Sequence, residues 1–398
     1  MANDFEGPSP RRRPDSKVEE AKVALRAFFE ANPAETFYLA QLEVLFEKKF
    51  FHWITNRALE ELVDLEYLRT ERLAFGPAEL RKMIVSLSIE PDSRIAPLEL
   101  RFYRLNSTKS RYSKRRALAK AKFVAAYSRS SMTHGLGPHG EMMVDAALST
   151  VGFTVKAKDV REWNGRKWIF TDNDLDRIYE RDGDEYGAEI KNTLAYIDKE
   201  LLLTKLSIAK FFDVRPLFIV RRAPQNYIEM VRKRGGFTLI LDYQLYPFGF
   251  RTLAKKVQAA LGLPVDSPPS LADQTAKRFL DWHYRRRRID RIRAYLKGKL
   301  PGAQIGDEPY AGGGHRFRVV PEEVRNNLKL QQRVFDELMG KSTGEEPLTW
   351  TLLTPREFLD TISLDDLANL LEGSAVADAL SVMKNVLLTT TGPEPLES

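Results

Sequence analysis

FTDNDLDRIYERDGDEYGAEIKNTL, residues 170–194, contains two short extended segments separated by a turn. The Asp-Gly pair within RDGDE predicts the turn, because this dipeptide is among the strongest short-range signals for a β-hairpin. Side chains in a strand alternate between the two faces of a sheet. Asp174 and Asp176 therefore share one face of the first strand, and a hairpin would bring that face together with the one that carries Glu189 and Lys191.

The coincidence of these faces predicts a site for a hard divalent cation. Up to three carboxylates, from Asp174, Asp176 and Glu189, would come within reach of one ion, with the ammonium of Lys191 beside them. Mg²⁺ prefers octahedral oxygen coordination, and proteins usually hold it by one or two carboxylates together with water and substrate phosphate. A Glu-x-Lys pattern by itself is more often a cross-strand ion pair, so the surrounding elements have to decide between the two interpretations.

The elements expected around this stretch form an α/β unit over residues 138–250. Apolar residues at helical spacing predict a helix at 140–153, closed by Gly152. Three extended segments follow, joined by turns that contain Asn-Gly and Asp-Gly. A long helix, a strand buried on both faces, a helix that starts with proline and a last strand are then expected at 197–212, 216–222, 224–235 and 236–247. The predicted fold class is α/β, with a mixed central sheet flanked by helices.

Four residues in this order of elements resemble the motifs of the PD-(D/E)XK (restriction-endonuclease-like) nuclease superfamily. They are Glu141 in the first helix, Asp176 in the hairpin, and Glu189 with Lys191 in AEIK. The succession of helices and strands from 138 to 244 also matches the core of that superfamily. The first motif departs from the family pattern, because it lacks its proline and offers Asp174 as a rival to Asp176. We prefer Asp176, because the apolar strand continues from it.

The resemblance implies a metal-dependent phosphodiester hydrolase in which these residues are catalytic. Asp176, Glu189 and the backbone carbonyl of Ile190 would hold Mg²⁺, for which Mn²⁺ is an expected substitute. The ion would polarise the scissile phosphate and offset the charge that develops in an in-line displacement. Lys191 would orient the attacking water or help to deprotonate it. Glu141 would hold a second metal through water, or position Lys191.

The N-terminal part of the chain resembles a winged-helix domain over residues 17–105. Three short helices and two extended segments are expected there, at 17–31, 37–50, 52–64, 66–75 and 98–105. The third helix would take the recognition position, with Arg57 as a candidate DNA contact. Many domains of this architecture serve as protein-contact modules instead, so both roles stay open.

Basic residues gather in two blocks outside these units. Residues 101–130 hold ten Lys or Arg and no Asp or Glu, and residues 277–299 hold ten against two Asp. Such blocks face water or bind a polyanion, and beside a nuclease-like motif we expect DNA phosphate contacts. The candidates are Lys114, Arg115, Arg116, Lys120, Lys122, Arg285, Arg286, Arg287 and Arg288. Nearer the carboxylates, the following residues are either phosphate contacts or ordinary side chains: His139, Lys205, Lys210, Arg221 and Arg222.

The composition of the 398-residue chain narrows the class of protein. It has no cysteine, which excludes disulfides, thiolate metal sites and cysteine nucleophiles. It has no apolar run long enough to cross a bilayer, and residues 1–16 lack the apolar stretch of a secretory signal. We therefore expect an intracellular, cytoplasmic protein with no membrane partner, and with the nucleoid as a candidate location.

The expected organisation has five parts. They are a disordered lead-in (1–16), a winged-helix-like domain (17–105), a basic connector (106–137), a PD-(D/E)XK nuclease domain (138–250) and a mainly helical C-terminal region with an acidic tail (251–398). The tail is acidic because residues 345–398 hold ten acidic residues against two basic ones.

The expected function is that of a Mg²⁺-dependent endonuclease acting on DNA, duplex rather than single-stranded, in a defence, recombination or mobile-element system. One such core makes one cut, so a double-strand break would require a homodimer or a partner subunit. Two alternatives stay open. One is a non-catalytic DNA-binding or assembly subunit in which the nuclease fold is only structural, and the other is an RNA-processing nuclease.

Overall fold

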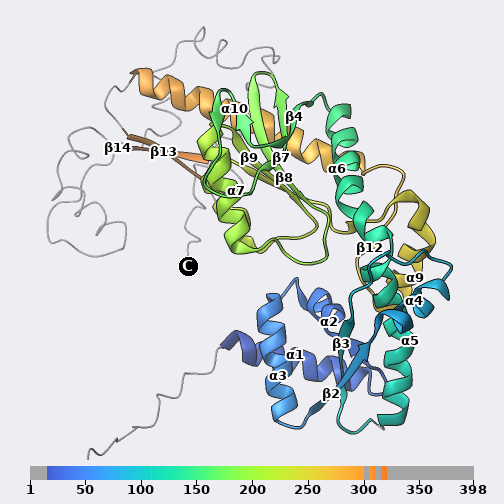
Figure 1. Ribbon diagram of the computed structural model, residues 1–398. Coiled ribbons are helices and arrows are strands. Elements are labelled where there is room, and N and C mark those ends of the chain that lie inside the picture. The colour runs from blue at the N-terminus through green and yellow to red at the C-terminus, as the bar shows by residue number, and fades with distance from the viewer. Residues whose placement is uncertain (1–15, 109, 300–303, 310–314, 321–398) are drawn as a thin grey trace, which may run out of the picture. The chain divides into compact units, whose positions relative to one another are not determined.

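The computed structural model describes residues 16–108, 110–299, 304–309 and 315–320 (Figure 1). The chain divides into two compact units, Met1–Phe279 and Leu280–Ser398. None of the helices in these described ranges is both long enough and apolar enough to cross a membrane. The finer division into five parts stays a prediction.

The N-terminal part of the first unit consists of helices packed against a three-stranded sheet. Its elements are α1 (Ser16–Ala31), β1 (Phe37–Tyr38), α2 (Leu39–Phe46), α3 (His52–Asp64), β2 (Leu68–Phe75), α4 (Pro77–Val85) and β3 (Leu98–Leu105). Strand β3 lies in the middle of the sheet and pairs antiparallel with β1 and β2. The helix expected at 37–50 is shorter than predicted, because Phe37 and Tyr38 pair with β3. Apolar residues of α1, α2 and α3, among them Leu25, Leu42 and Leu59, close a core with this sheet.

Two long helices follow, α5 (Ser110–Arg129) and α6 (Met132–Thr150). Helix α6 begins earlier than the helix expected at 140–153, because it starts at Met132 and runs through Pro138. A glycine in this segment permits close packing. A Cβ atom at Gly140 would lie 2.7 Å from the Cβ of Asn192, so α6 approaches the segment after the site closely only because this position has no side chain.

A five-stranded mixed sheet forms the centre of the α/β region, with the strand order β10-β9-β8-β7-β4. Its strands are β4 (Thr154–Val160), β7 (Leu175–Arg181), β8 (Asp184–Lys191), β9 (Arg215–Val220) and β10 (Phe237–Ile240). The pairs β4–β7 and β7–β8 are antiparallel, whereas β8–β9 and β9–β10 are parallel. The predicted α/β class with a mixed central sheet is confirmed.

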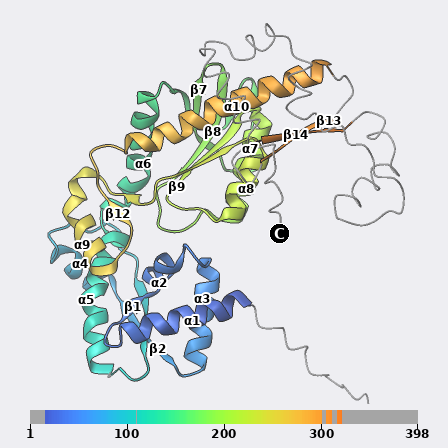
Figure 2. The ribbon, with the colours of Figure 1, turned by 180° about the vertical axis from the view of Figure 1, so that it is seen from behind.

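Helices cover both faces of this sheet. Helix α6 lies on one face and α7 (Lys199–Phe212) on the other (Figure 1). Ile178 of β7 packs with Ile208 of α7, while the next residue, Tyr179, bonds to Asp145 of α6. Helix α8 (Gln225–Lys233) lies beside β9 on the α7 side, as seen from behind in Figure 2. Strand β9 is buried at nearly every position because both faces are covered.

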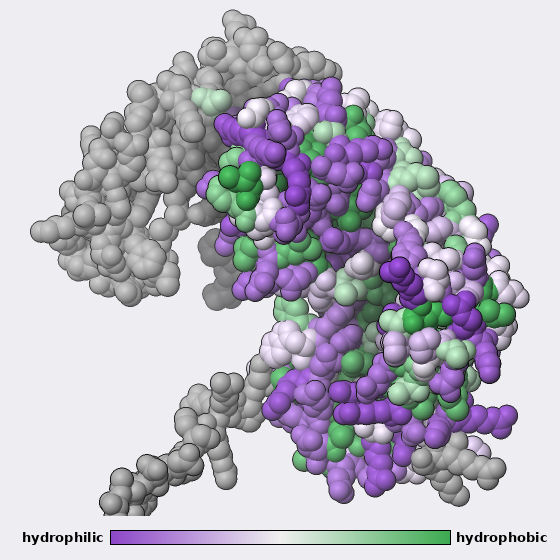
Figure 3. All heavy atoms as spheres, viewed as in Figure 1, coloured by the Kyte–Doolittle hydropathy of each residue, from purple (hydrophilic) through white to green (hydrophobic). Residues whose placement is uncertain are grey.

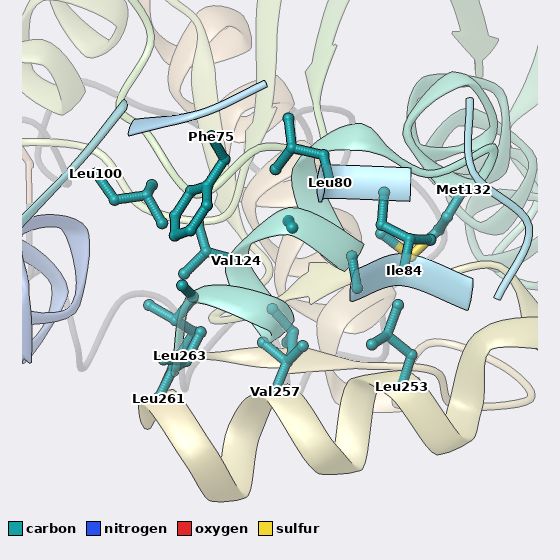
Figure 4. Close-up of a cluster of buried hydrophobic side chains, with 14 of the residues drawn as sticks. Phe75, Leu80, Ile84, Leu100, Val124, Met132, Leu253, Val257, Leu261 and Leu263 are labelled. Carbon is teal, nitrogen blue, oxygen red and sulfur yellow. The ribbon is translucent and has the colours of Figure 1, made fainter. Parts of the chain in front are cut away.

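The strand expected at 236–247 is in fact two strands. The chain turns at Asp242, whose φ is +67°, and continues as β11 (Gln244–Leu245), which pairs with β12 (Val265–Asp266) outside the central sheet. Between them lie η1 (Phe248–Phe250) and α9 (Arg251–Leu261). Leu253, Val257 and Leu261 of α9 point toward side chains of α4 and α5 (Figure 4). The segment after the sheet therefore shares a core with the helices before it.

Short hairpins and one long helix complete the described part of the chain. Strands β5 (Glu162–Trp163) and β6 (Arg166–Lys167) pair around the predicted Asn-Gly turn. In helix α10 (Asp273–Lys299), Phe279 packs against Phe153, and both of these residues belong to the first unit. The antiparallel pair β13 (Gln304–Pro309) and β14 (His315–Val320) falls in the region predicted to be mainly helical and was not predicted. The acidic tail at 345–398 lies outside the described residues.

Candidate active site

Strands β7 and β8 carry three residues of the predicted site. The hairpin that these strands were predicted to form is confirmed. Its turn consists of Asp182 and Gly183, whose φ angles of +53° and +81° suit the right-handed twist of the paired strands. The register places Arg177 opposite Ala188. One residue further from the turn, Asp176 of β7 therefore lies opposite Glu189 of β8.

Asp176 and Glu189 are this facing pair; Glu189 is buried and Asp176 is partly buried. Oδ2 of Asp176 accepts a 2.6 Å hydrogen bond from the N–H of Ile190, which fixes the carboxyl group against the neighbouring strand. The side chain of Glu189 is only 1% exposed. Burial and then the charge of Glu189 raise the pKa of Asp176 to about 6. A divalent cation would favour the ionised state of both carboxylates.

Two lysines from different elements contact Glu189. Nζ of Lys191 lies 2.8 Å from Oε1, and Nζ of Lys205 in α7 contacts Oε2. Burial acts to lower the pKa of Lys191, but Glu189, Asp176 and Asp174 outweigh it and hold this pKa above its ordinary value. Lys191 is therefore an ammonium near neutral pH, and its partly exposed side chain is accessible to a substrate.

Asp174 precedes β7 and differs from Asp176 in its contacts. Its Oδ1 lies 3.5 Å from Nζ of Lys205, and its side chain is 35% exposed. Asp174 thus shares a cation with Glu189, whereas Asp176 lies directly against β8.

The sequence predicts Lys205 as either a phosphate contact or an ordinary side chain, whereas the structure places it beside Glu189. A signal was present in the sequence of α7. The helix face that carries Lys205 is otherwise formed by buried apolar residues, which are Leu202, Leu206, Ile208, Ala209 and Phe212. A lysine on such a face requires a carboxylate partner, because an unpaired buried charge is costly.

Glu141 lies on the other face of the sheet, in α6. Nη2 of Arg177 donates to its carboxylate at 2.7 Å, and Nε of Arg177 donates to Asp145 at 3.2 Å. Nη1 of the same guanidinium donates to the backbone carbonyl of Asp176 at 2.7 Å. Because consecutive residues of a strand face opposite sides, these bonds connect Glu141 to the backbone of Asp176 and not to its carboxylate. The structure does not bring Glu141 into the group formed by Asp176, Glu189 and Lys191.

Asn192 anchors the end of β8 directly after Lys191. Its side-chain amide donates to the carbonyls of Leu136 and Leu245, both at 2.7 Å, and accepts a bond from the N–H of Leu245 at 2.7 Å. The end of the strand is therefore tied to α6 and to β11, which fixes the backbone that carries Lys191.

Two of the other candidate phosphate contacts are buried inside the molecule. His139 lies in α6 with its ring edge-on to Phe248, and burial lowers its pKa. Arg221 donates two bonds to Glu47, at 2.7 and 2.6 Å. Arg222 is partly buried, and Lys210 is exposed on α7.

The basic residues of α5 differ in their surroundings. Lys114 and Arg115 are exposed. Lys120 donates to Glu35 at 3.3 Å and to the carbonyl of Thr36 at 2.6 Å, and burial, as the largest effect, lowers its pKa. Lys120 therefore has an internal role, whereas Lys114 and Arg115 are accessible to a partner. Polar residues cover much of the face of the molecule seen in Figure 3.

Several remaining candidates for DNA contact already have partners. Arg57 pairs with Glu61 at 2.9 Å, Arg116 lies 3.9 Å from Glu35, Lys122 lies over the ring of Phe123, and Arg286 pairs with Asp290 at 2.8 Å. Arg285 is exposed and Arg287 is partly buried, while the side chain of Arg288 lies outside the described part. DNA binding by all these residues stays a prediction.

In the part of the chain that the structure describes, no group of three or more His, Asp or Glu side chains is arranged to hold a metal ion. Of the predicted ligands, Glu141 lies on the other face of the sheet and the rival Asp174 lies beside Lys205, which leaves the two carboxylates of Asp176 and Glu189 and the backbone carbonyl of Ile190. This set fits Mg²⁺ in kind and number, because Mg²⁺ keeps several waters and takes one or two carboxylates from the protein.

Comparisons with known proteins give no family for this chain. No model of a known protein family matches the sequence, and no curated protein matches it. A crystal structure of AF1548, a protein of unknown function, is similar at 18% sequence identity, with an alignment that covers 63% of this chain and 96% of that chain. Its TM-score of 0.18 is too low to establish a common fold.

Proposed function

We propose that this protein is a Mg²⁺-dependent nuclease that hydrolyses phosphodiester bonds of DNA. The observation that carries the proposal is the carboxylate pair of Asp176 and Glu189 on adjacent strands, with the ammonium of Lys191 2.8 Å from Glu189. The mixed sheet, with α6 before it in the chain and α7 after the hairpin, supports a PD-(D/E)XK core. Bound Mg²⁺ would polarise the scissile phosphate and offset the charge that develops on it.

The side chains of the site would have distinct roles. Asp176, Glu189 and the carbonyl of Ile190 would hold the ion. Lys191 has a raised pKa, so we assign its ammonium to donating hydrogen bonds to the attacking water or a phosphate oxygen, and not to removing a proton. Arg177, supported by Glu141, would keep the backbone of Asp176 in place.

The N-terminal region would supply DNA binding. The order α1, α2, α3 and the antiparallel pair β2–β3 support a winged-helix domain with α3 in the recognition position and Arg57 on it. The exposed residues Lys114 and Arg115 would contact phosphates without reading sequence. A second copy or a partner subunit would be needed to cut both strands.

A non-catalytic DNA-binding or assembly subunit is the second candidate, and one observation favours it. Each carboxylate oxygen of Glu189 already contacts a lysine, one from Lys191 and one from Lys205. The charge of Glu189 is therefore balanced within the chain, as in a purely structural ion-pair network.

Plasmid nicking in Mg²⁺ separates the two candidates. For a nuclease, Glu189→Gln and Lys191→Ala should each lower the nicking rate by about 100-fold or more, since both touch the reacting groups. DNA affinity, measured by fluorescence anisotropy, should stay close to that of the wild type. Lys199→Ala, exposed at the start of α7, is the matched control and should leave both the nicking rate and the DNA affinity unchanged.

The result that supports the assembly subunit is a wild-type protein that binds DNA and cuts none. Cutting that survives both Glu189→Gln and Lys191→Ala would overturn the assignment of the site. Offering duplex DNA, single-stranded DNA and RNA of one sequence at fixed salt identifies the substrate in the same assay.

A further inference from the structure

We propose that Lys205 is a displaceable internal cation of the carboxylate site. It holds Glu189 and Asp174 while no divalent cation is bound, and it releases Glu189 when one binds. The inference rests on the proposed function, because it concerns the same site and gives it a defined resting state.

Lys205 lies between two carboxylates, one buried and one partly exposed. Nζ contacts Oε2 of Glu189, whose side chain is 1% exposed, and lies 3.5 Å from Oδ1 of Asp174, whose side chain is 35% exposed. The lysine itself is 5% exposed and approaches the hairpin from α7. One ammonium therefore connects the interior carboxylate to one at the edge of the site.

Charge balance explains why the lysine should move. The resting site holds three carboxylates, from Asp174, Asp176 and Glu189, and two ammonium groups, from Lys191 and Lys205. A divalent cation on Asp176 and Glu189 would add two positive charges beside an ammonium that contacts the same Glu189. Like charges at such short range in a poorly solvated site repel strongly, so one of the cations has to leave Glu189.

Lys205 has a place to go. Asp174 already lies 3.5 Å from Nζ, so the ammonium can transfer fully to this carboxylate without losing its counter-charge. The flexible lysine stem permits the shift without movement of α7. In its released position Lys205 would still contribute positive charge at the edge where a phosphate enters. Lys191 instead lies on the same strand as Glu189 and is bound closely to the other oxygen.

Mn²⁺ binding to the full-length protein, followed by electron paramagnetic resonance, tests the proposal without any substrate. Lys205→Gln removes the competing charge and keeps a polar side chain, so it should bind Mn²⁺ at least tenfold more tightly than the wild type, equal to about 1.4 kcal/mol. Lys210→Gln, exposed on the same helix, is the matched control and should bind like the wild type.

Each other outcome has a definite meaning. Equal or weaker Mn²⁺ binding by a folded Lys205→Gln overturns the displacement and makes Lys205 a fixed part of the site. Binding of Mn²⁺ by neither protein would overturn the proposed metal site itself, and the inference with it.

Amine labelling of the wild type provides a second test that does not depend on the folding of a variant. Acetic anhydride followed by mass spectrometry measures the reaction rate of each lysine. The rate at Lys205 should rise severalfold as Mn²⁺ saturates the site, because the ammonium leaves the interior, while the rate at Lys210 stays constant. A rate at Lys205 that stays constant or falls with Mn²⁺ would contradict the proposal.

Discussion

Asp176 shows how the surroundings of one side chain decide its chemistry. Strand alternation makes Asp174 and Asp176 equivalent in the sequence, since both fall on the same face. In the structure β7 begins between them, at Leu175. Asp176 therefore lies against β8 and accepts a hydrogen bond from the N–H of Ile190. Asp174 lies at the edge of the site, beside Lys205.

The raised pKa of Asp176 predicts a pH-dependent stability. Its pKa is about 6 when folded and 3.8 by its ordinary value. Between these pH values the folded state binds more protons than the unfolded state. The contribution of Asp176 to the free energy of unfolding is therefore full below about pH 4 and is lost as the pH rises through about 6. The difference between these two pKa values corresponds to about 3 kcal/mol of stability at most. In metal-free buffer, Asp176→Asn should be more stable than the wild type at pH 8 and equally stable at pH 4.

Urea denaturation at both pH values checks this difference. Asp174→Asn is the control, because it makes the same change two residues away and removes only the ion pair with Lys205. A loss of stability in Asp176→Asn that is the same at pH 8 and pH 4 would contradict the electrostatic argument. If the pair binds Mg²⁺, the ion should raise the melting temperature of the wild type and not that of Asp176→Asn.

At the scale of elements, a hairpin and a helix fix the geometry of the site. The turn of Asp182 and Gly183 sets the register that makes Asp176 and Glu189 face each other. Helix α6 packs closely on Asn192 and thereby supports the end of β8. A small change in either element should therefore affect the site without touching a catalytic residue.

Gly183→Ala tests the turn. The glycine has a φ of +81° and open space around an added Cβ, so the only cost is the backbone conformation. We expect a loss of about 1–2 kcal/mol in the free energy of unfolding, measured by urea denaturation. Gly249→Ala, which also has open space but no positive φ, is the control and should be nearly neutral.

Gly140→Ala tests the contact of α6 with Asn192. The added methyl would lie 2.7 Å from Cβ of Asn192, an atom that cannot rotate away. Overpacking of this kind costs about 1–3 kcal/mol. The loss should exceed any effect of Gly249→Ala in the same denaturation experiment. A gain in stability, as helix propensity alone would give, would show that the backbone of α6 relaxes at no cost.

At the scale of the whole first unit, a buried ion pair connects the N-terminal region to the α/β region. Arg221, at the end of β9, donates two bonds to Glu47, which follows α2. Burial acts to raise the pKa of Glu47, but Arg221 and then His52 outweigh it and hold the pKa below its ordinary value. The ring of His52 also stacks on Tyr196, at 4.1 Å. The loop after Lys191 is thereby linked to the start of α3.

Arg221→Met should destabilise the protein by about 3–5 kcal/mol, because it leaves Glu47 buried without a partner. The double variant Glu47→Gln with Arg221→Met should recover part of this loss. Arg57→Met breaks an exposed pair with Glu61 and serves as the control, with an expected cost of about 1 kcal/mol or less. Thermal unfolding of the wild type, Arg221→Met, Glu47→Gln and the double variant measures the coupling, and additive losses would show that the pair is not coupled.

Local patterns determined much of this protein. Alternation and the Asp-Gly turn were enough to predict the hairpin and the α/β class, because strand period and turn chemistry depend on near neighbours. Helical spacing likewise predicted α1, α3 and α7. The same rules correctly placed Asp176, Glu189 and Lys191 on paired strands.

The tertiary structure decided which residues from distant segments pack together or form ion pairs. It carried α6 through Pro138 and packed Gly140 of this helix on Asn192. It placed Glu141 on the opposite face of the sheet from the carboxylate pair, and it buried Lys205 against Glu189. None of these outcomes has a local signature strong enough to rank one partner above another, because packing and charge pairing depend on which surfaces meet and not on spacing along the chain.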